Sequence, residues 1–162
     1  PGIRSSLGKP EASLAVNDSM RYECRWMYLL VQKHNCRALS GLEEGELLRI
    51  PVAHKEGKFV LPREMEGELL DEMRRRGQIV MIYAKPDGTP AMGEYPYNPN
   101  GSLADVAAIC NKEGNVVGMM PHPERAAFWW QLPDWSRSGS PRKYGDGHSV
   151  ISSFVEYLKS LT

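Results

Sequence analysis

The sequence predicts an α/β fold with a mixed sheet, and three segments carry this prediction. Residues 21–32 (RYECRWMYLLVQ) alternate with a period of two, which is typical of a strand with one face turned inward. Residues 62–77 have the pattern of an amphipathic helix and lead into the apolar run 78–84, a strand covered on both faces. Strand patterns on either side of residues 111–114 (NKEG) predict a hairpin with Gly114 in the left-handed conformation. One helical crossover followed by hairpins indicates a mixed rather than a purely parallel sheet.

The other elements follow from equally local signals. Pro62 suits the first position of the helix, and Gly77 is expected to end it. Gly57 is expected to turn the chain from one strand into the next. The remaining expected elements are a loop over 1–11, strands over 13–17 and 47–54, a short helix over 124–132, a polar loop over 133–147 and an amphipathic helix over 148–161.

Composition excludes several classes of protein. The 162 residues suffice for one domain with a sizeable core, and Lys+Arg and Asp+Glu both count 20. A zero net charge argues against nucleic-acid binding, and Arg74–Arg76 is explained by the negative end of the predicted helix. No apolar run is long enough to span a membrane. Three cysteines without a CxxC pair favour a reducing compartment, so we expect a cytoplasmic protein, and no metal-ligand spacing is present.

The segment MMPHPERA (119–126) carries the clearest chemical signal. A residue before proline is driven to an extended conformation, so His122 and Glu124 point to the same side of the chain. A carboxylate on one ring nitrogen fixes the tautomer and leaves the other nitrogen free to take a proton. The spacing also fits a plain strand end, with an exposed histidine and a glutamate that caps the next helix. Residue types alone leave both interpretations open.

A base of this kind needs a nucleophile, and the cysteines do not provide one. Cys24 alternates with aromatic residues in a strand, Cys36 sits in KHNCRAL, and Cys110 ends a hairpin strand. None has the glycine-flanked strand-to-helix turn that exposes a nucleophile. We therefore expect all three to be small hydrophobic residues remote from, or shielded from, His122.

Four segments taken together resemble a known family. NDSMRYECRW (17–26), PVAHKEGKF (51–59), residues 98–126 from NPNGS to MMPHPERA, and YGDGHSVISSFVEYL (144–158) resemble the C-terminal part of the glutaminase component of phosphoribosylformylglycinamidine synthase. This component is a class I glutamine amidotransferase of purine biosynthesis, with a flavodoxin-like domain. The resemblance implies that His122 and Glu124 complete a Cys-His-Glu triad.

The resemblance also implies the reaction and its partners. L-Glutamine would be hydrolysed to glutamate and ammonia, and the ammonia would pass to an ATP-dependent synthetase acting on formylglycinamide ribonucleotide. The expected partners are a large synthetase subunit and a small bridging subunit. No cofactor is expected in this subunit, because ATP and Mg²⁺ belong to the synthetase.

The same resemblance leads us to expect that residues 1–162 are the C-terminal part of a single amidotransferase domain. The nucleophilic cysteine and the oxyanion-hole loop would then lie upstream of Pro1, and these residues alone would be inactive. Two alternatives stay open on sequence grounds. One is a non-catalytic binding or assembly domain of the same fold, and the other is a different class I amidotransferase.

Five further residues are candidates for the substrate site or for an interface. His54 and Glu56 repeat the H-x-E spacing in a loop that the family also carries, although a polar hairpin loop explains them equally well. Turn chemistry accounts for the others, which the resemblance places near the active face: Asn98, Asn100 and Ser102. Among Trp129, Trp130 and Trp135, we expect one of the first two in the core, and an exposed pair would suit a partner surface.

Overall fold

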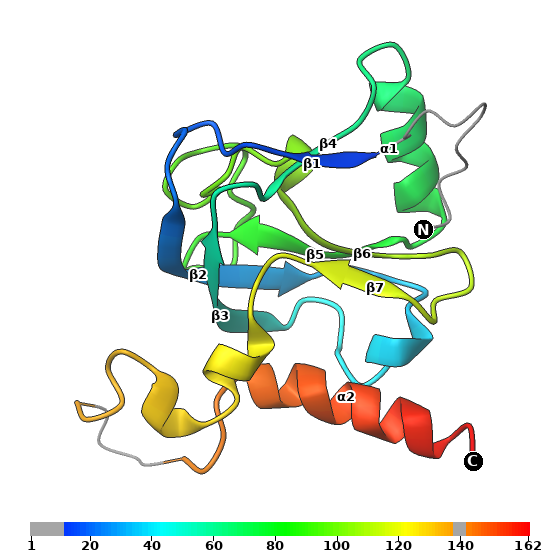
Figure 1. The fold of residues 1–162 in the computed structure, drawn as a ribbon. Coiled ribbons are helices and arrows are strands. Elements are labelled where there is room, and N and C mark those ends of the chain that lie inside the picture. The colour runs from blue at the N-terminus through cyan, green and yellow to red at the C-terminus, as the bar shows by residue number, and fades with distance from the viewer. Residues whose placement is uncertain (1–11, 138–141) are drawn as a thin grey trace.

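The computed structural model describes residues 12–137 and 142–162, so the loop expected over 1–11 and part of the 133–147 loop lie outside the described residues. In chain order the described elements are β1 (Ser13–Ala15), β2 (Glu23–Val31), η2 (Arg37–Leu39), β3 (Leu47–His54), β4 (Lys58–Val60), α1 (Glu66–Arg75), β5 (Ile79–Ala84), η3 (Leu103–Asp105), β6 (Val106–Cys110), β7 (Val117–Met119), η4 (Pro123–Ala126), η5 (Trp129–Gln131) and α2 (Gly147–Lys159), where η marks a short 3₁₀ helix (Figure 1).

The strands form two sheets. A five-stranded sheet has the order β3-β2-β5-β6-β7, and β1 pairs with β4 in a second, two-stranded sheet. Every strand pair among the described residues is antiparallel. The predicted α/β class with hairpins is confirmed, including the β6–β7 hairpin with Gly114 at φ +70°, whereas the parallel pairs of a mixed sheet are not found among the described residues.

Apolar side chains pack on both sides of the large sheet. In Figure 1, α2 runs below this sheet, whereas α1, β1 and β4 lie above it. Val150 of α2 shares the main core with Ile50 of β3 and Leu29 of β2, and all three are fully buried. A second cluster joins α1 to β4, β5 and β6 through Phe59, Leu61, Leu69, Met73, Ile79 and Val106. Burying a side chain of this size contributes roughly 1.5–3 kcal/mol, so both helices are held mainly by their apolar faces.

The outer edge of β3 holds the segment that follows β7. Pro51 lies in this edge strand, where proline is tolerated because its missing N–H would point away from the sheet. Its carbonyl accepts a hydrogen bond of 2.8 Å from the His122 backbone N–H. Two residues earlier, the Arg49 N–H donates to the Asp146 carboxylate at 2.8 Å. The edge of β3 therefore fixes both the His122 segment and the start of α2.

Helix α1 begins later than predicted. Pro62 is not its first residue, because residues 62–65 form a turn in which the Met65 N–H donates to the Pro62 carbonyl at 3.0 Å. Met65 has non-helical angles, and the turn reorients the chain so that Leu69 and Met73 face the buried Leu61. The predicted end at Gly77 is confirmed, since Gly77 has φ +63° and residues 77 and 78 bond back to the last turn of the helix.

The helix predicted over 124–132 is wrong as a single element. The chain forms the short helices η4 and η5, interrupted by Phe128 in an extended conformation. Phe128 pairs with Tyr144 in an isolated antiparallel bridge. This long-range pairing overrides the local helical preference of the segment.

Two glycines permit α2 to approach η4 closely. A Cβ on Gly147 would lie 2.0 Å from the Pro123 carbonyl oxygen, and one on Gly145 would lie 2.4 Å from the Ala126 oxygen. Both atoms belong to the backbone, which cannot yield as a flexible side chain can.

Gly147→Ala is therefore expected to lower the free energy of unfolding by about 1–3 kcal/mol through overpacking against η4. Denaturant unfolding measures the change. Gly67→Ala is the matched control, because nothing lies within 4 Å of a Cβ at that position in α1. The control should stabilise by about 0.5–1 kcal/mol, as alanine replaces glycine in a helix. Equal effects of the two substitutions would contradict the close approach.

Candidate functional site

His122 and Glu124 form a hydrogen-bonded pair just beyond the end of β7. His122 Nδ1 lies 2.8 Å from Glu124 Oε1, and the two side chains are 30% and 61% exposed. Donation from Nδ1–H to the carboxylate leaves Nε2 as the nitrogen able to accept a proton. The predicted same-side geometry is confirmed, and the carboxylate serves the imidazole rather than a helix cap, since no side chain caps η4.

Several elements hold this pair in place. The His122 backbone is bonded to β3, and Met120 N–H continues the β6–β7 ladder by donating to the Ala107 carbonyl at 3.3 Å. On the other side, Gln131 Nε2 donates to the Glu124 carbonyl at 3.0 Å. Arg125 Nε lies 3.6 Å from Glu124 Oε1 and adds a weaker electrostatic contact. An imidazole and the carboxylate bonded to it thus sit on a rigid support with one ring nitrogen uncommitted.

His54 and Glu56 do not form a second pair of this kind. The Glu56 side chain is exposed, whereas His54 is 7% exposed and neither ring nitrogen has a hydrogen-bond partner. The ring packs against Gly57, where a Cβ would lie 2.2–2.7 Å from three ring atoms. Burial lowers the pKa of His54, the nearby His122 lowers it further, and Glu23 acts in the opposite direction. His54 is therefore an enclosed imidazole whose pKa is lowered, mainly by burial.

Asn98, Asn100 and Ser102 are buried, and their side chains bond to the protein itself. Asn98 Nδ2 donates to Asp105 Oδ1 at 2.9 Å, and its Oδ1 accepts the backbone N–H groups of Gly101 and Ser102. Asn100 Nδ2 and Ser102 Oγ both donate to the Gly57 carbonyl, at 2.7 and 3.3 Å. These residues hold the turn that covers His54, and their place as substrate-site or interface candidates stays a prediction.

The sequence did not reveal the structural importance of Asn17. This residue lies in NDS, which suggests an ordinary turn, yet its side chain is fully buried. Its Nδ2 donates to the carbonyls of Arg21 and His54 at 2.9 and 2.8 Å, and its Oδ1 accepts the Gly57 N–H at 3.1 Å. Asn17 thereby joins the turn before β2 to the turn after β3. Its partners lie up to 40 residues away, so no local pattern could have identified this role.

A buried acid also escaped notice. Glu23 is 3% exposed on the inward face of β2, directly opposite His54 in the strand pair. Its carboxylate accepts a hydrogen bond of 2.6 Å from Ser19 Oγ and lies 2.6 Å from Arg25 Nη2. The only signal of its burial in the sequence was the alternation of the strand, which places Glu23 on the same face as Arg25 and Met27.

No hydrogen bond joins any of the three cysteines to His122 in the described residues. Cys36 and Cys110 are buried, Cys110 Sγ donates to Asn35 Oδ1 at 3.1 Å, and Cys110 lies opposite Val117, at the start of β7 rather than at its end. Cys24 is exposed on β2. None of the three is bonded to the uncommitted nitrogen of His122.

Two absences hold for residues 12–137 and 142–162, the part of the chain that the structure describes. Within this part of the chain, no three His, Cys, Asp or Glu side chains gather closely enough to bind a metal ion. None of its helices combines the length and apolar character needed to cross a lipid bilayer.

Comparisons with known proteins agree with this geometry. The family model of the CobB/CobQ-like glutamine amidotransferase domain matches residues 1–158. The chain belongs to this amidotransferase family. Phosphoribosylformylglycinamidine synthase subunit PurQ from Archaeoglobus fulgidus is 42% identical over 153 residues, which cover 94% of this chain and 53% of that protein. The subunit of the same name from Treponema denticola is 44% identical over 117 residues, covering 70% of this chain and 42% of that protein.

A solved structure of PurLQS from Thermotoga maritima contains a similar amidotransferase fold. One of its chains superposes with a TM-score of 0.60 at 29% sequence identity, covering 94% of this chain and 55% of that one. The chain thus spans about half the length of the relatives it matches. The class I amidotransferase fold expected from the sequence is confirmed.

The enclosed histidines should make stability depend on pH. Burial lowers the pKa of both His54 and His34 in the folded state, so the unfolded state binds more protons below about pH 6.5. The free energy of unfolding should therefore fall as the pH drops from 7 towards 5, by at most about 1.4 kcal/mol per pH unit for each histidine.

His54→Leu should flatten this slope, because leucine has a similar size and does not titrate. His34→Leu should remove a separate part of it. Denaturant unfolding at a series of pH values measures both slopes. An unchanged slope in His54→Leu would show that this imidazole is not held neutral.

Proposed function

We propose that this protein is the glutaminase part of phosphoribosylformylglycinamidine synthase, hydrolysing L-glutamine to glutamate and ammonia for purine biosynthesis. The observation that carries the proposal is the hydrogen-bonded His122–Glu124 pair, with one ring nitrogen uncommitted, in an amidotransferase fold. The names of the similar proteins support the choice of this reaction over that of another class I amidotransferase.

In the proposed reaction a cysteine thiolate attacks the carboxamide carbon of glutamine. His122 first takes the thiol proton at Nε2 and then gives it to the departing amine, while Glu124 holds the ring and stabilises the imidazolium. Ammonia leaves, and water hydrolyses the resulting thioester to glutamate. We place the thiol upstream of Pro1, because in the described residues none of Cys24, Cys36 and Cys110 is hydrogen-bonded to the imidazole.

The ammonia would then pass to a large synthetase subunit, which would bind ATP and Mg²⁺ and act on formylglycinamide ribonucleotide. A small bridging subunit would complete the assembly, and this chain itself would carry no cofactor. The assembly in the Thermotoga structure supports an association with other subunits. We place the reaction in the cytoplasm, where reducing conditions keep free thiols such as Cys36 and Cys110 reduced.

His122→Ala and Glu124→Gln test the proposal in the full subunit assembled with its synthetase. Loss of the base should lower kcat for ammonia release from L-glutamine by roughly 10⁴–10⁶-fold, because the members of a triad act as a unit. Loss of the orienting carboxylate should lower kcat by up to about 10⁴-fold. Glu64→Gln is the control, since Glu64 is exposed and far along the chain from the pair. Full activity in both site variants would favour a non-catalytic domain of the same fold.

The nucleophile can be tested separately. The 162-residue chain by itself should release no ammonia from glutamine. Cys24→Ser in the full assembly should keep kcat within about twofold of the unmodified protein, because no hydrogen bond joins this thiol to His122 in the described residues. Ammonia release by the short chain that disappears in Cys24→Ser would identify Cys24 as the nucleophile. It would also overturn the upstream assignment.

A further inference from the structure

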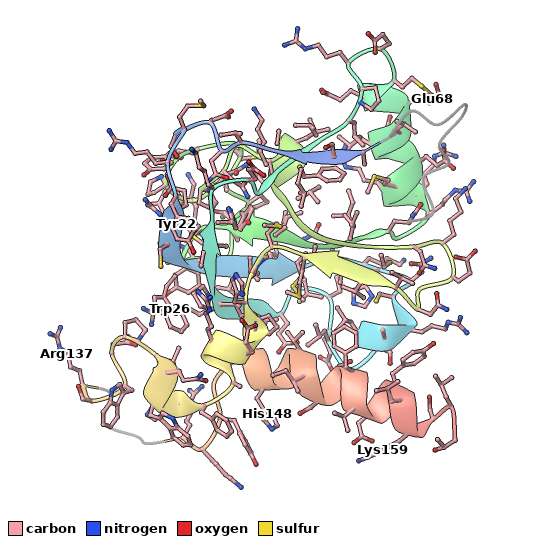
Figure 2. The ribbon with its side chains drawn as sticks, in the orientation of Figure 1. Tyr22, Trp26, Glu68, Arg137, His148 and Lys159 are labelled. Carbon is pink, nitrogen blue, oxygen red and sulfur yellow. The ribbon has the colours of Figure 1, made fainter. Side chains whose placement is uncertain are left out.

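Four aromatic side chains form a continuous row next to the His122–Glu124 pair. Trp130 stacks on Phe128 with ring centres 4.6 Å apart, and Phe128 lies 6.2 Å from Tyr144. Tyr144 in turn stacks on His148 at 3.6 Å. We call these four residues the aromatic row. Figure 2 shows its last member, His148, near the end of α2 that faces the loop carrying Arg137.

The aromatic row is exposed although its backbone is fixed. Trp130, Phe128 and Tyr144 are 57%, 40% and 39% exposed. The bridge between Phe128 and Tyr144 fixes the middle of the row, and the first turn of α2 carries its His148 end. Single exposed aromatic residues are common, but a contiguous group on a rigid support is characteristic of an interaction surface.

The charge next to the row is positive and uncompensated. The Arg142 guanidinium lies 5.6 Å from the Trp129 ring centre, and the Lys143 ammonium lies 4.9 Å from that of Tyr144. Neither cation forms an ion pair within the described residues.

The nearby acids already have partners. Asp134 accepts two hydrogen bonds of 2.9 Å from Arg49, Asp146 accepts the Arg49 backbone N–H, and Glu124 binds His122. The surface therefore offers aromatic faces flanked by two available cations.

The row is also coupled to the proposed catalytic pair. Gln131 Oε1 accepts the Phe128 N–H at 2.8 Å, while its Nε2 donates to the Glu124 carbonyl at 3.0 Å. A partner resting on the row would thus lie beside His122 and Glu124, which are partly exposed.

We propose that the aromatic row, with Arg142 and Lys143, is the docking surface for an acidic face of the synthetase subunit, a contact that would cover the His122–Glu124 pair. This inference rests on the proposed function. A second copy of this chain fits less well, because a two-fold contact through the row would bring the same cations together. Nucleic acid fits less well too, since the net charge of the whole chain is zero.

Binding of the full subunit to the synthetase subunit, measured without glutamine at about 0.05 and 0.5 M salt, tests the proposal. Trp130→Ala should raise Kd by roughly 10-fold or more, as expected when an exposed aromatic anchor is removed. The double variant Arg142→Glu and Lys143→Glu should raise Kd by a larger factor than Trp130→Ala at low salt. At high salt its effect on Kd should be smaller than at low salt.

The controls are matched in chemistry and lie elsewhere on the surface. Tyr22→Ala removes an aromatic residue that is 61% exposed, and Arg63→Glu with Arg75→Glu reverses two exposed charges around α1. Both should leave Kd within about twofold. Thermal unfolding of each variant, with a midpoint close to that of the unmodified protein, shows that the fold is intact.

An unchanged Kd in Trp130→Ala, or a charge-reversal effect that does not weaken with salt, would overturn the proposal. The proposal would also be overturned if the unmodified protein dimerised and the row variants did not. The same holds if it bound single-stranded RNA and the row variants lost that binding while still binding the synthetase subunit. Ammonia release separates this proposal from the proposed function. If the docking surface is wrong, the variants keep both the Kd and the ammonia release of the unmodified protein. If the proposed function is wrong, the assembly releases no ammonia from glutamine, although the variants still lose binding to the synthetase subunit.

Discussion

The 2.8 Å hydrogen bond from His122 N–H to the Pro51 carbonyl is the contact on which the arrangement of the site depends. An edge strand normally presents a free row of donors and acceptors that invites another chain. In β3 the middle of that row is occupied, because Pro51 has no donor, its carbonyl binds His122, and the Arg49 donor binds Asp146. The same contacts that block the edge therefore position the imidazole and the first turn of α2.

The His122–Glu124 site combines a rigid support with an open face. Glycines at 145 and 147 let α2 press against η4 at backbone distance, so the segment carrying His122 and Glu124 is supported from below. Above it, the pair and the aromatic row remain accessible. The general base that we propose must hold its geometry and also admit substrate, and this division between a packed support and an exposed surface is compatible with both needs.

The sequence predicted those features that depend on neighbouring residues. Three examples are the β6–β7 hairpin, the end of α1 at Gly77 and the His122–Glu124 pair. Each of them is formed by residues that lie only a few positions apart in the sequence. Features made by distant segments were missed. Phe128 breaks a helical pattern because it pairs with Tyr144, and His54 is enclosed because Asn17 and Asn100 fix Gly57 over it. Periodicity describes one segment at a time, so it could not show these contacts.

The dependence of the His122 segment on α2 also sets an order of assembly. β3 is synthesised about 70 residues before His122, and α2 only after it, so the edge of β3 has neither partner while the chain is still growing. The amides and carbonyls of that edge are then free to pair with another nascent chain. His122 and Asp146 thus cover the outer edge of β3 only after residues 122–146 have been synthesised.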